Sequence, residues 1–249
     1  MAGHSKWKQI KRKKAVTDSR RASAWTKLIR EITVSAKAGG GDPDGNPRLR
    51  LAIDTARDAN MPNENIERAV KKGTGELEGA SYEEVSYEGY GPGGTALYIE
   101  GSTDNANRTV AEIRHALDRN GGKLAATNSV AYLFDRKGQL VIEAGRLDED
   151  KVMEDALDSG AEDFERDGDQ FIVSTSPAGL HAVQAALRTR GYAVASAEIA
   201  MVPKNLVRVD GPDADRVIKL IDALEELDDV SKVFSNVDID ASALAEADA

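Results

Sequence analysis

The sequence predicts an α+β protein, in which a basic N-terminal arm and a three-helix bundle precede two ferredoxin-like α+β domains. Two observations support this prediction. From Ser19 to Gly73 apolar residues recur every three to four positions, which is the period of amphipathic helices. Beyond residue 80, short segments of alternating apolar residues are interspersed with helical segments. That pattern is typical of antiparallel sheets covered by helices on one face.

The first helix of the bundle is expected from Ser19 to about Lys37, and it has two unlike faces. One face is apolar and must be buried against other helices. Its members are Trp25, Leu28, Ile29, Ile32 and Ala36. The opposite face is basic and is left free for a partner. Its members are Arg20, Lys27, Arg30 and Lys37.

The other two helices of the bundle have clear start and stop signals. Asn46 is expected to cap the second helix, with Pro47 at the first helical position. The third helix is expected to begin near Met61 and to end at Gly73, because glycine readily ends a helix.

The rest of the sequence predicts two domains that each contain both strands and helices. The expected elements are strands 82–90 and 95–100, helix 104–119, a hairpin of strands 129–134 and 139–143 turning at 135–138, helix 148–159, a short strand at Phe164, strand 170–175, helix 177–190, strand 193–201, strand 206–209, helix 214–227 and strand 231–237. Neither the elements at 80–127 nor those at 204–238 complete a split βαβ unit alone. The segment between them contains all the strands and helices of such a unit. We therefore expect the third domain to be inserted into the second. The expected domains are residues 1–79 with the basic arm and bundle, 80–128 together with 204–240, 129–203, and a flexible tail at 241–249.

Charge is divided unequally along the chain. Residues 1–72 hold 17 Lys and Arg against 8 Asp and Glu, a net of +9, whereas residues 73–249 carry a net of −19 within a total of −10. Such asymmetry indicates a polyanion as the partner of the basic end. Both tryptophans, Trp7 and Trp25, lie in the basic part, and an indole among cations can stack on a nucleic-acid base.

We therefore predict a nucleic-acid interface at the N-terminal end. Its predicted residues are Lys6, Trp7, Lys8, Lys11, Arg12, Lys13, Lys14, Arg20, Arg21, Lys27 and Arg30. A second set on later helices is a candidate extension, and it consists of Arg50, Arg57, Arg108, His115 and Arg119. Three other interpretations of the lysine run stay open, namely a solvated tail, a nuclear localisation patch and an organelle transit peptide.

Composition excludes several kinds of chemistry. The chain has no cysteine, which rules out disulfides, thiol catalysis and cysteine-ligated zinc. No apolar run approaches the ~18 residues that a membrane span needs, and the basic start lacks the apolar stretch of a secretory signal. The histidines, His4, His115 and His181, are too dispersed to form a metal site by spacing. We expect no cofactor, metal, small-molecule substrate or membrane partner, and a cytoplasmic location.

Two polar segments suggest chemistry but have simpler structural explanations. Residues 89–94 could cradle a phosphate, but they lack the Lys-Ser/Thr end of a P-loop, so a tight turn is favoured. Residues 103–108 offer oxygen ligands for a cation, but they also form a good helix cap, and capping is favoured. No nucleophile elbow or carboxylate dyad is recognisable. The prediction is a binding protein, not an enzyme.

Several short sequence blocks, in this order along the chain, are characteristic of a protein family. They are Met-Ala-Gly-His-Ser-Lys-Trp (1–7), Trp-Thr-Lys-Leu-Ile-Arg-Glu-Ile (25–32), Gly-Gly-Asp-Pro (40–43), Asn-Pro-Arg-Leu-Arg (46–50), Asn-Met-Pro (60–62), Ile-Glu-Arg-Ala (66–69), Tyr-Glu-Gly-Tyr-Gly-Pro-Gly-Gly (87–94), Thr-Asp-Asn-Ala-Asn-Arg-Thr (103–109) and Ser-Val-Ala-Tyr-Leu-Phe (129–134). Together they resemble the YebC/PmpR family over essentially the full length. The resemblance implies a three-domain, cytoplasmic, DNA-binding transcriptional regulator. The chain also resembles a mitochondrial translational activator of cytochrome oxidase subunit I, which implies ribosome binding and easier synthesis through proline-rich stretches.

Three functional hypotheses therefore stand side by side: a DNA-binding regulator, a translation factor that binds the ribosome or ribosomal RNA, and a protein-only adaptor that uses its acidic body. The connection at 38–45 is longer than the usual three- to four-residue turn of a helix-turn-helix. Recognition of RNA by shape is therefore at least as plausible as operator binding.

Overall fold

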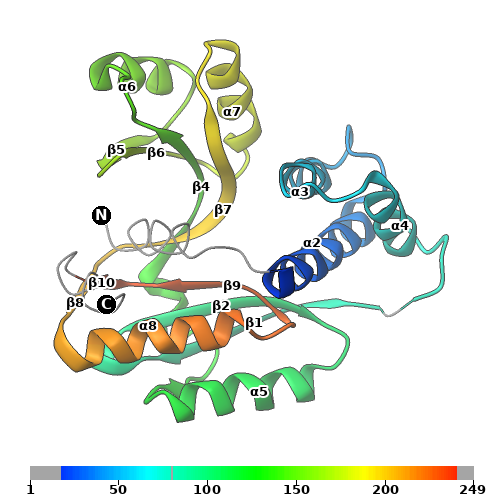
Figure 1. Cartoon of the computed structure of the whole chain (residues 1–249), viewed down its shortest axis with the longest axis vertical. Helices are drawn as coiled ribbons and strands as arrows, with labels where there is room; N and C mark the ends of the chain where they lie inside the picture. Colours follow the sequence, from blue (N-terminus) through cyan, green and yellow to red (C-terminus); the bar gives the residue numbers. More distant parts are fainter. Residues whose placement is uncertain (1–17, 80, 240–249) are drawn as a thin grey trace.

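The computed structural model of the chain describes residues 18–79 and 81–239, with side chains from Ala24 onward (Figure 1). Its architecture is the predicted α+β class. An N-terminal helical bundle lies beside one four-stranded sheet, and a second four-stranded sheet is inserted in the sequence between strands of the first (Figure 1). Within the described ranges no helix is both long and apolar enough to cross a membrane.

The bundle consists of α2 (Asp18–Gly39), α3 (Pro47–Asp58) and α4 (Asn63–Gly73). Its core is formed by the apolar faces that the sequence predicts, including Ile32, Leu49 and Ile66. The predicted cap is confirmed, because the Asn46 side-chain oxygen accepts a hydrogen bond from the Leu49 amide at 3.1 Å. The Asn46 amide nitrogen also donates to the carbonyl of Ser35 at 2.8 Å, so one side chain starts α3 and attaches it to α2.

The first sheet has the strand order β3-β1-β2-β9, with all neighbours antiparallel. Its strands are β1 (Glu83–Tyr90), β2 (Ala96–Thr103), β3 (Lys123–Leu124) and β9 (Val230–Ser235). Helices α5 (Ala106–Arg119) and α8 (Gly211–Glu225) cover one face of it (Figure 1). A short parallel pair, β8 (Val207–Val209) with β10 (Val237–Ile239), lies at the edge of the same core.

The second sheet has the order β5-β6-β4-β7 and is wholly antiparallel. Its elements follow the chain as β4 (Phe134–Glu143), α6 (Glu149–Asp158), β5 (Asp163–Asp167), β6 (Gln170–Thr175), α7 (Leu180–Thr189) and β7 (Val194–Pro203). This βαββαβ succession is the ferredoxin-like arrangement. A separate apolar cluster, which includes Phe134, Met201 and Phe234, joins this sheet to the first one.

The predicted hairpin at 129–143 is wrong. Residues 131–133 form a single 3₁₀ turn, and β4 then runs unbroken through residues 135–138, where the turn was expected. Long-range pairing overrides the local turn chemistry, because residues 134–138 pair continuously with β7. Gly138 serves close packing instead of a turn, since a Cβ there would lie 2.9 Å from the Thr175 methyl group.

A glycine controls how closely α4 approaches α2. A Cβ added at Gly73 would lie 2.4 Å from the carbonyl oxygen of Thr33. We expect Gly73→Ala to lower the free energy of unfolding by about 1–3 kcal/mol, because the two helices must separate to admit the methyl group. Urea denaturation measures the loss. Gly45→Ala is the matched control, since its Cβ would have no neighbour closer than 3.9 Å. Equal stability of the two variants would contradict this explanation of the helix packing.

Candidate nucleic-acid interface

Most of the predicted interface precedes the part of the chain that the structure describes. Lys6, Trp7, Lys8, Lys11, Arg12, Lys13 and Lys14 lie outside the described residues. Arg20 and Arg21 belong to the first turns of α2, and their side chains also lie outside the description. Their role in binding nucleic acid stays a prediction.

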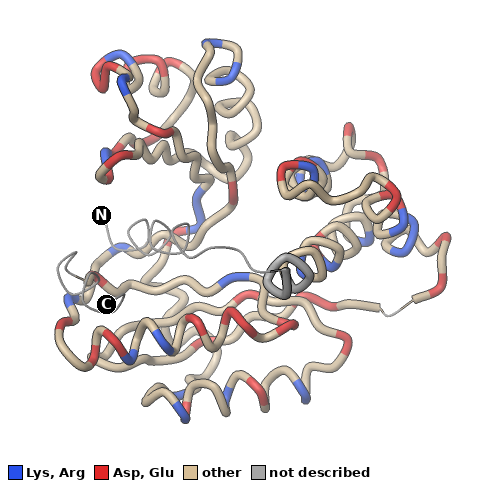
Figure 2. Tube along the Cα trace, in the orientation of Figure 1, with Lys and Arg blue, Asp and Glu red and all other residues tan. Residues whose placement is uncertain are grey.

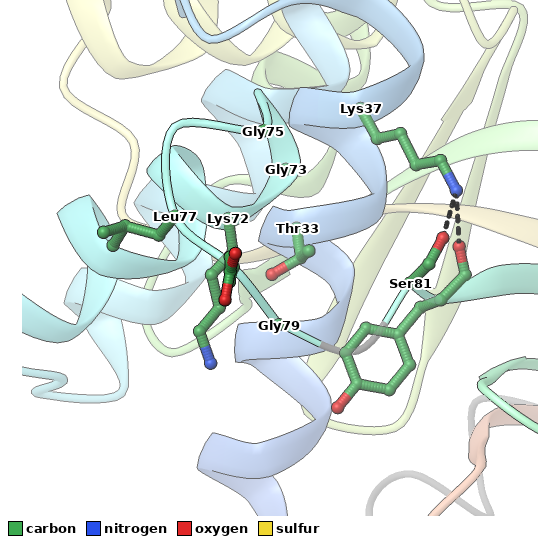
Figure 3. A pocket seen from close by; sticks show the side chains of 10 residues that line it. Thr33, Lys37, Lys72, Gly73, Gly75, Leu77, Gly79 and Ser81 are labelled. Carbon is green, nitrogen blue, oxygen red and sulfur yellow. Dashed lines mark hydrogen bonds between the residues drawn. The ribbon is translucent and has the colours of Figure 1, made fainter.

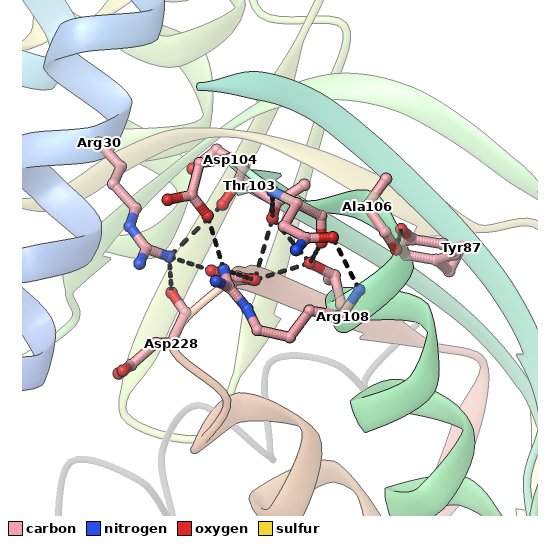
Figure 4. A network of polar contacts seen from close by, with 11 residues as sticks. Arg30, Tyr87, Thr103, Asp104, Ala106, Arg108 and Asp228 are labelled. Carbon is pink, nitrogen blue, oxygen red and sulfur yellow. Dashed lines mark hydrogen bonds and ion pairs between the residues drawn. The ribbon is translucent and has the colours of Figure 1, made fainter. Parts of the chain in front are cut away.

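The two remaining members of the predicted interface, Lys27 and Arg30, contact the end of α8 and the acidic turn that follows it. The Lys27 ammonium donates to the carbonyl oxygen of Glu225. The Arg30 guanidinium donates to the Asp228 carbonyl and to the Asp229 carboxylate, each at 2.6 Å (Figure 4). The middle of α2 is therefore attached to the body by two of the cations that the sequence assigns to a partner.

The carboxylate of Asp229 is the centre of this attachment. Its side chain is only 2% exposed, and it accepts hydrogen bonds from four side chains (Figure 4). The donors are Arg30 at 2.6 Å, Arg108 at 2.7 Å, Thr103 at 3.0 Å and Thr109 at 2.6 Å. Burial by itself would raise the pKa of Asp229, but these hydrogen bonds and the charge of Arg30 together hold it below its usual value.

The polar segment at 103–108 builds the second half of the same network. As predicted, it caps a helix, since the Asn105 side chain accepts from the Arg108 amide at 3.1 Å at the start of α5. The cap also directs the Arg108 guanidinium toward Asp229, with Asp104 at 2.8 Å as its other partner. The hydrogen bond to Asp229 is the main reason that the pKa of Arg108 lies above its usual value.

The candidate extension of the interface is not brought together by the fold. Arg108 is committed to Asp229. Arg50 bonds to Pro43 and Asp44 and lies 3.1 Å from His181, so it connects α3 to α7. The other three, Arg57, His115 and Arg119, are exposed on α3 and α5. Along the backbone, cations follow α2 and the end of α4, whereas acids follow α8 (Figure 2).

Sequence reasoning missed three residues that fix the relative positions of the elements: Arg48, Glu88 and Asp229. Arg48 on α3 bonds to Glu31 at 2.9 Å and to Glu84 at 2.5 Å, so it connects α3 to α2 and β1. The hydrogen bond from Arg48 lowers the pKa of Glu84. The only available signal was that Arg48 and Glu88 each lie inside one of the characteristic blocks, whereas Asp229 lies in none.

A pocket of about 590 Å³ opens between α2, α4 and the segment that leads to β1 (Figure 3). At its rim, the Lys37 ammonium donates to the Ser81 hydroxyl at 2.8 Å and to the Tyr82 carbonyl at 3.3 Å. Lys37 thus fixes the linker against the bundle. Neither Lys27 nor Arg30, the predicted interface residues whose side chains the structure describes, lines the pocket.

The fold and these contacts define the class: an α+β protein whose N-terminal helical bundle is fastened by arginines to a body of two sheets. Comparison with known proteins gives the family. Residues 5–76 match the TACO1/YebC protein N-terminal domain, and residues 82–237 match the TACO1/YebC second and third domain. The chain belongs to the TACO1/YebC family, as its resemblance to YebC/PmpR proteins implied.

Relatives align along nearly their whole length. A "probable transcriptional regulatory protein" of Gemmatimonas aurantiaca is 56% identical over 99% of this chain and 100% of its own. One of the same description from Chlorobium luteolum is 54% identical over 98% of both chains. The crystal structure of a conserved hypothetical protein from Aquifex aeolicus superposes with a TM-score of 0.84 at 47% identity, covering 92% of this chain and 94% of that one.

The Asp229 network predicts a characteristic dependence of stability on pH. Since the pKa of this carboxylate is depressed in the folded protein, its stabilisation is present above the unfolded value of about 3.9 and is lost as the pH falls through the folded pKa. We expect Asp229→Asn to cost about 2–4 kcal/mol at pH 7, where Arg30 loses its counter-charge and Arg108 loses one of two acidic partners. The cost should shrink as the pH falls from the unfolded value through the folded pKa, because the wild-type protein then loses the stabilisation that the variant lacks at every pH.

Urea denaturation at pH 7 and at pH 3 measures both effects. Asp215→Asn, an exposed acid on α8, is the matched control and should change stability by less than about 0.5 kcal/mol at either pH. A penalty for Asp229→Asn that is the same at both pH values would show that the lost charge is not its cause.

Proposed function

We propose that the protein is a non-enzymatic regulator of gene expression that acts in the cytoplasm and binds nucleic acid, with DNA as the first candidate, through its basic N-terminal end. One observation carries the proposal. Residues 1–72 have a net charge of +9, whereas the remainder has −19. The printed description of the relatives as probable transcriptional regulatory proteins supports the regulatory part.

Elementary electrostatics explains how such a chain would work. Lysines and arginines at the N-terminal end neutralise phosphates and release condensed counterions, and Trp7 stacks on a base. The acidic body repels the same polyanion, so binding is confined to one end of the molecule. Because Lys27 and Arg30 attach the middle of α2 to the body, the chain that precedes α2 leads into a helix in a fixed position.

A second candidate is a translation factor that binds ribosomal RNA on the ribosome and relieves stalling at proline-rich stretches. The observation that favours it is the connection between α2 and α3, which spans residues 40–46. This is longer than the three- to four-residue turn of a DNA-reading helix-turn-helix. Contacts to phosphate alone position a protein without reading sequence, and RNA can be recognised by shape.

The charge of the N-terminal segment can be tested directly. We expect a variant with Lys6, Lys8, Lys11, Arg12, Lys13 and Lys14 all changed to Gln to lose most of its affinity for duplex DNA. If six phosphates are released, the slope of log affinity against log salt should become shallower by about 5. Fluorescence anisotropy with a labelled duplex at several salt concentrations measures both quantities.

The matched control removes six exposed cations from the acidic remainder of the chain, and it is the sixfold Gln variant at Arg114, Arg146, Arg166, Arg188, Arg216 and Lys219. Its net charge equals that of the first variant, so a general charge effect would weaken both equally. Equal weakening would contradict binding through the N-terminal segment. Undiminished binding of a protein partner by the first variant, with no nucleic-acid affinity in the wild type, would identify a protein-only adaptor instead.

DNA and the ribosome are distinguished by two further measurements. A DNA regulator should prefer a particular duplex over random DNA by at least about 10³-fold. A ribosome factor should co-sediment with ribosomes, should lose that association in the N-terminal variant, and should show little preference among duplexes.

A further inference from the structure

Two characteristic sequence blocks, 87–94 and 129–134, meet in the structure through Glu88. This glutamate lies on β1 and is only 4% exposed. Its carboxylate accepts backbone hydrogen bonds from Asn128 and Val130, each at 2.6 Å, and from Ala131 at 2.9 Å. Its carbonyl accepts from the Ala125 amide at 2.8 Å. The Glu88 clamp, as we call these four bonds, holds the segment 125–131.

The clamp fixes a stretch of chain that has no sheet partners of its own. Three of its amides point at one buried carboxylate, and charge-assisted bonds of this kind are stronger than bonds between neutral groups. Asn128 adopts the left-handed conformation, with φ of 65°, which turns the segment onto the carboxylate. Further along, the Lys204 amide donates to the Leu133 carbonyl at 2.8 Å, so the segment is held at both ends.

This fixed segment and the adjacent end of β1 display two tyrosines. Tyr132 is 65% exposed, and Tyr90 is 40% exposed with its hydroxyl bonded to the Ser129 carbonyl at 3.1 Å. They are the only aromatic residues among the large exposed apolar side chains in the described part of the chain. The core takes Val130 and Phe134 from the same segment and leaves Tyr132 outside. Exposed aromatic rings on a rigid backbone are typical of binding surfaces.

The charge beside the tyrosines is positive. Tyr90 pairs with Lys123 across β1 and β3. Their side chains point to the face opposite α5, because a Cβ at the preceding residue, Gly89, would contact Leu117 of that helix. Lys123 is exposed and makes no ion pair within the described ranges. Two of the acids close to them in the chain have partners of their own, since Glu88 is buried and bonded to backbone amides and Asp135 pairs with Lys204 at 3.3 Å.

We propose that Tyr90 and Tyr132 form a stacking surface for the unpaired bases of single-stranded nucleic acid, with Lys123 contacting its phosphates. Exposed rings with a free cation beside them are the combination that single-strand binders use. Paired bases are stacked on one another and cannot use such rings. The inference rests on the proposed function, and it adds a second contact that distinguishes single strands from duplexes. Glu88 acts as a positioning residue for this surface.

The test uses the full-length protein with a labelled 12-nucleotide single-stranded RNA and a duplex of the same sequence. We expect Tyr132→Ala to weaken single-strand affinity about tenfold, since stacking of one base is worth roughly 1–3 kcal/mol. Tyr132→Phe keeps the ring and should bind as the wild type does. Neither variant should change duplex affinity or the salt dependence, whereas Lys123→Gln should make the single-strand slope shallower by about 0.7.

The positioning role of Glu88 has its own measurement. Glu88→Gln should speed hydrogen exchange at the amides of Asn128, Val130 and Ala131 and weaken single-strand affinity, with the salt slope unchanged. Faster exchange with full affinity would reduce Glu88 to a purely structural role and would overturn its part of the proposal.

The outcomes separate this inference from the proposed function. If the wild type binds neither probe, the proposed function fails. If it binds both, and the N-terminal cation variant loses both while Tyr132→Ala and Tyr90→Ala lose neither, the stacking surface is wrong and the proposed function stands. A protein partner for the tyrosines would give the same unchanged affinities and would likewise overturn the proposal.

Discussion

The arrangement of the molecule depends on one buried carboxylate. Asp229 follows α8, yet its donors come from α2, α5 and the end of β2, so a single charged group fixes the relative positions of three helices and a strand. Removing a carboxylate from water is costly, and the cost is offset only when several donors surround it. Arg30 bears part of that cost, since its Nε is buried and has no hydrogen-bond partner among the residues that the structure describes. The bundle is thus held by a charge network in which each buried group depends on the others for its hydrogen bonds.

The cations of the basic end fall into two groups: those that bond to other parts of the protein, and those that we propose bind a partner. Arg30 pairs with Asp229, Lys27 donates to the backbone at the end of α8, and Arg48 pairs with Glu31 and Glu84. The charge asymmetry of the sequence therefore has an internal use as well as the proposed external one. The same electrostatic attraction that would bring a polyanion to the N-terminal end also attaches the bundle to the body.

The predictions from sequence were accurate where the interacting residues are close in the chain, and they failed where these residues are far apart. The bundle helices and the Asn46 cap were predictable because their signals lie within a few residues of one another. The incomplete sets of strands at either end led to the expectation of an inserted domain, and in the sequence the strands β4 to β7 lie between β3 and β9. The hairpin at 129–143 failed, because Asp135-Arg136-Lys137-Gly138 has the composition of a turn but pairs with β7 about sixty residues later.

By itself, the sequence determined the α+β class, the helix boundaries, the family resemblance and the charge asymmetry, since all of these are properties of local pattern and composition. Only the tertiary structure decided which charges are used inside the molecule. Asp229 and its donor Arg30 are 199 residues apart, and Glu88 reaches amides 40 to 43 residues away. Whether a charged side chain is buried and paired depends on what the fold brings beside it, and no local pattern carries that information.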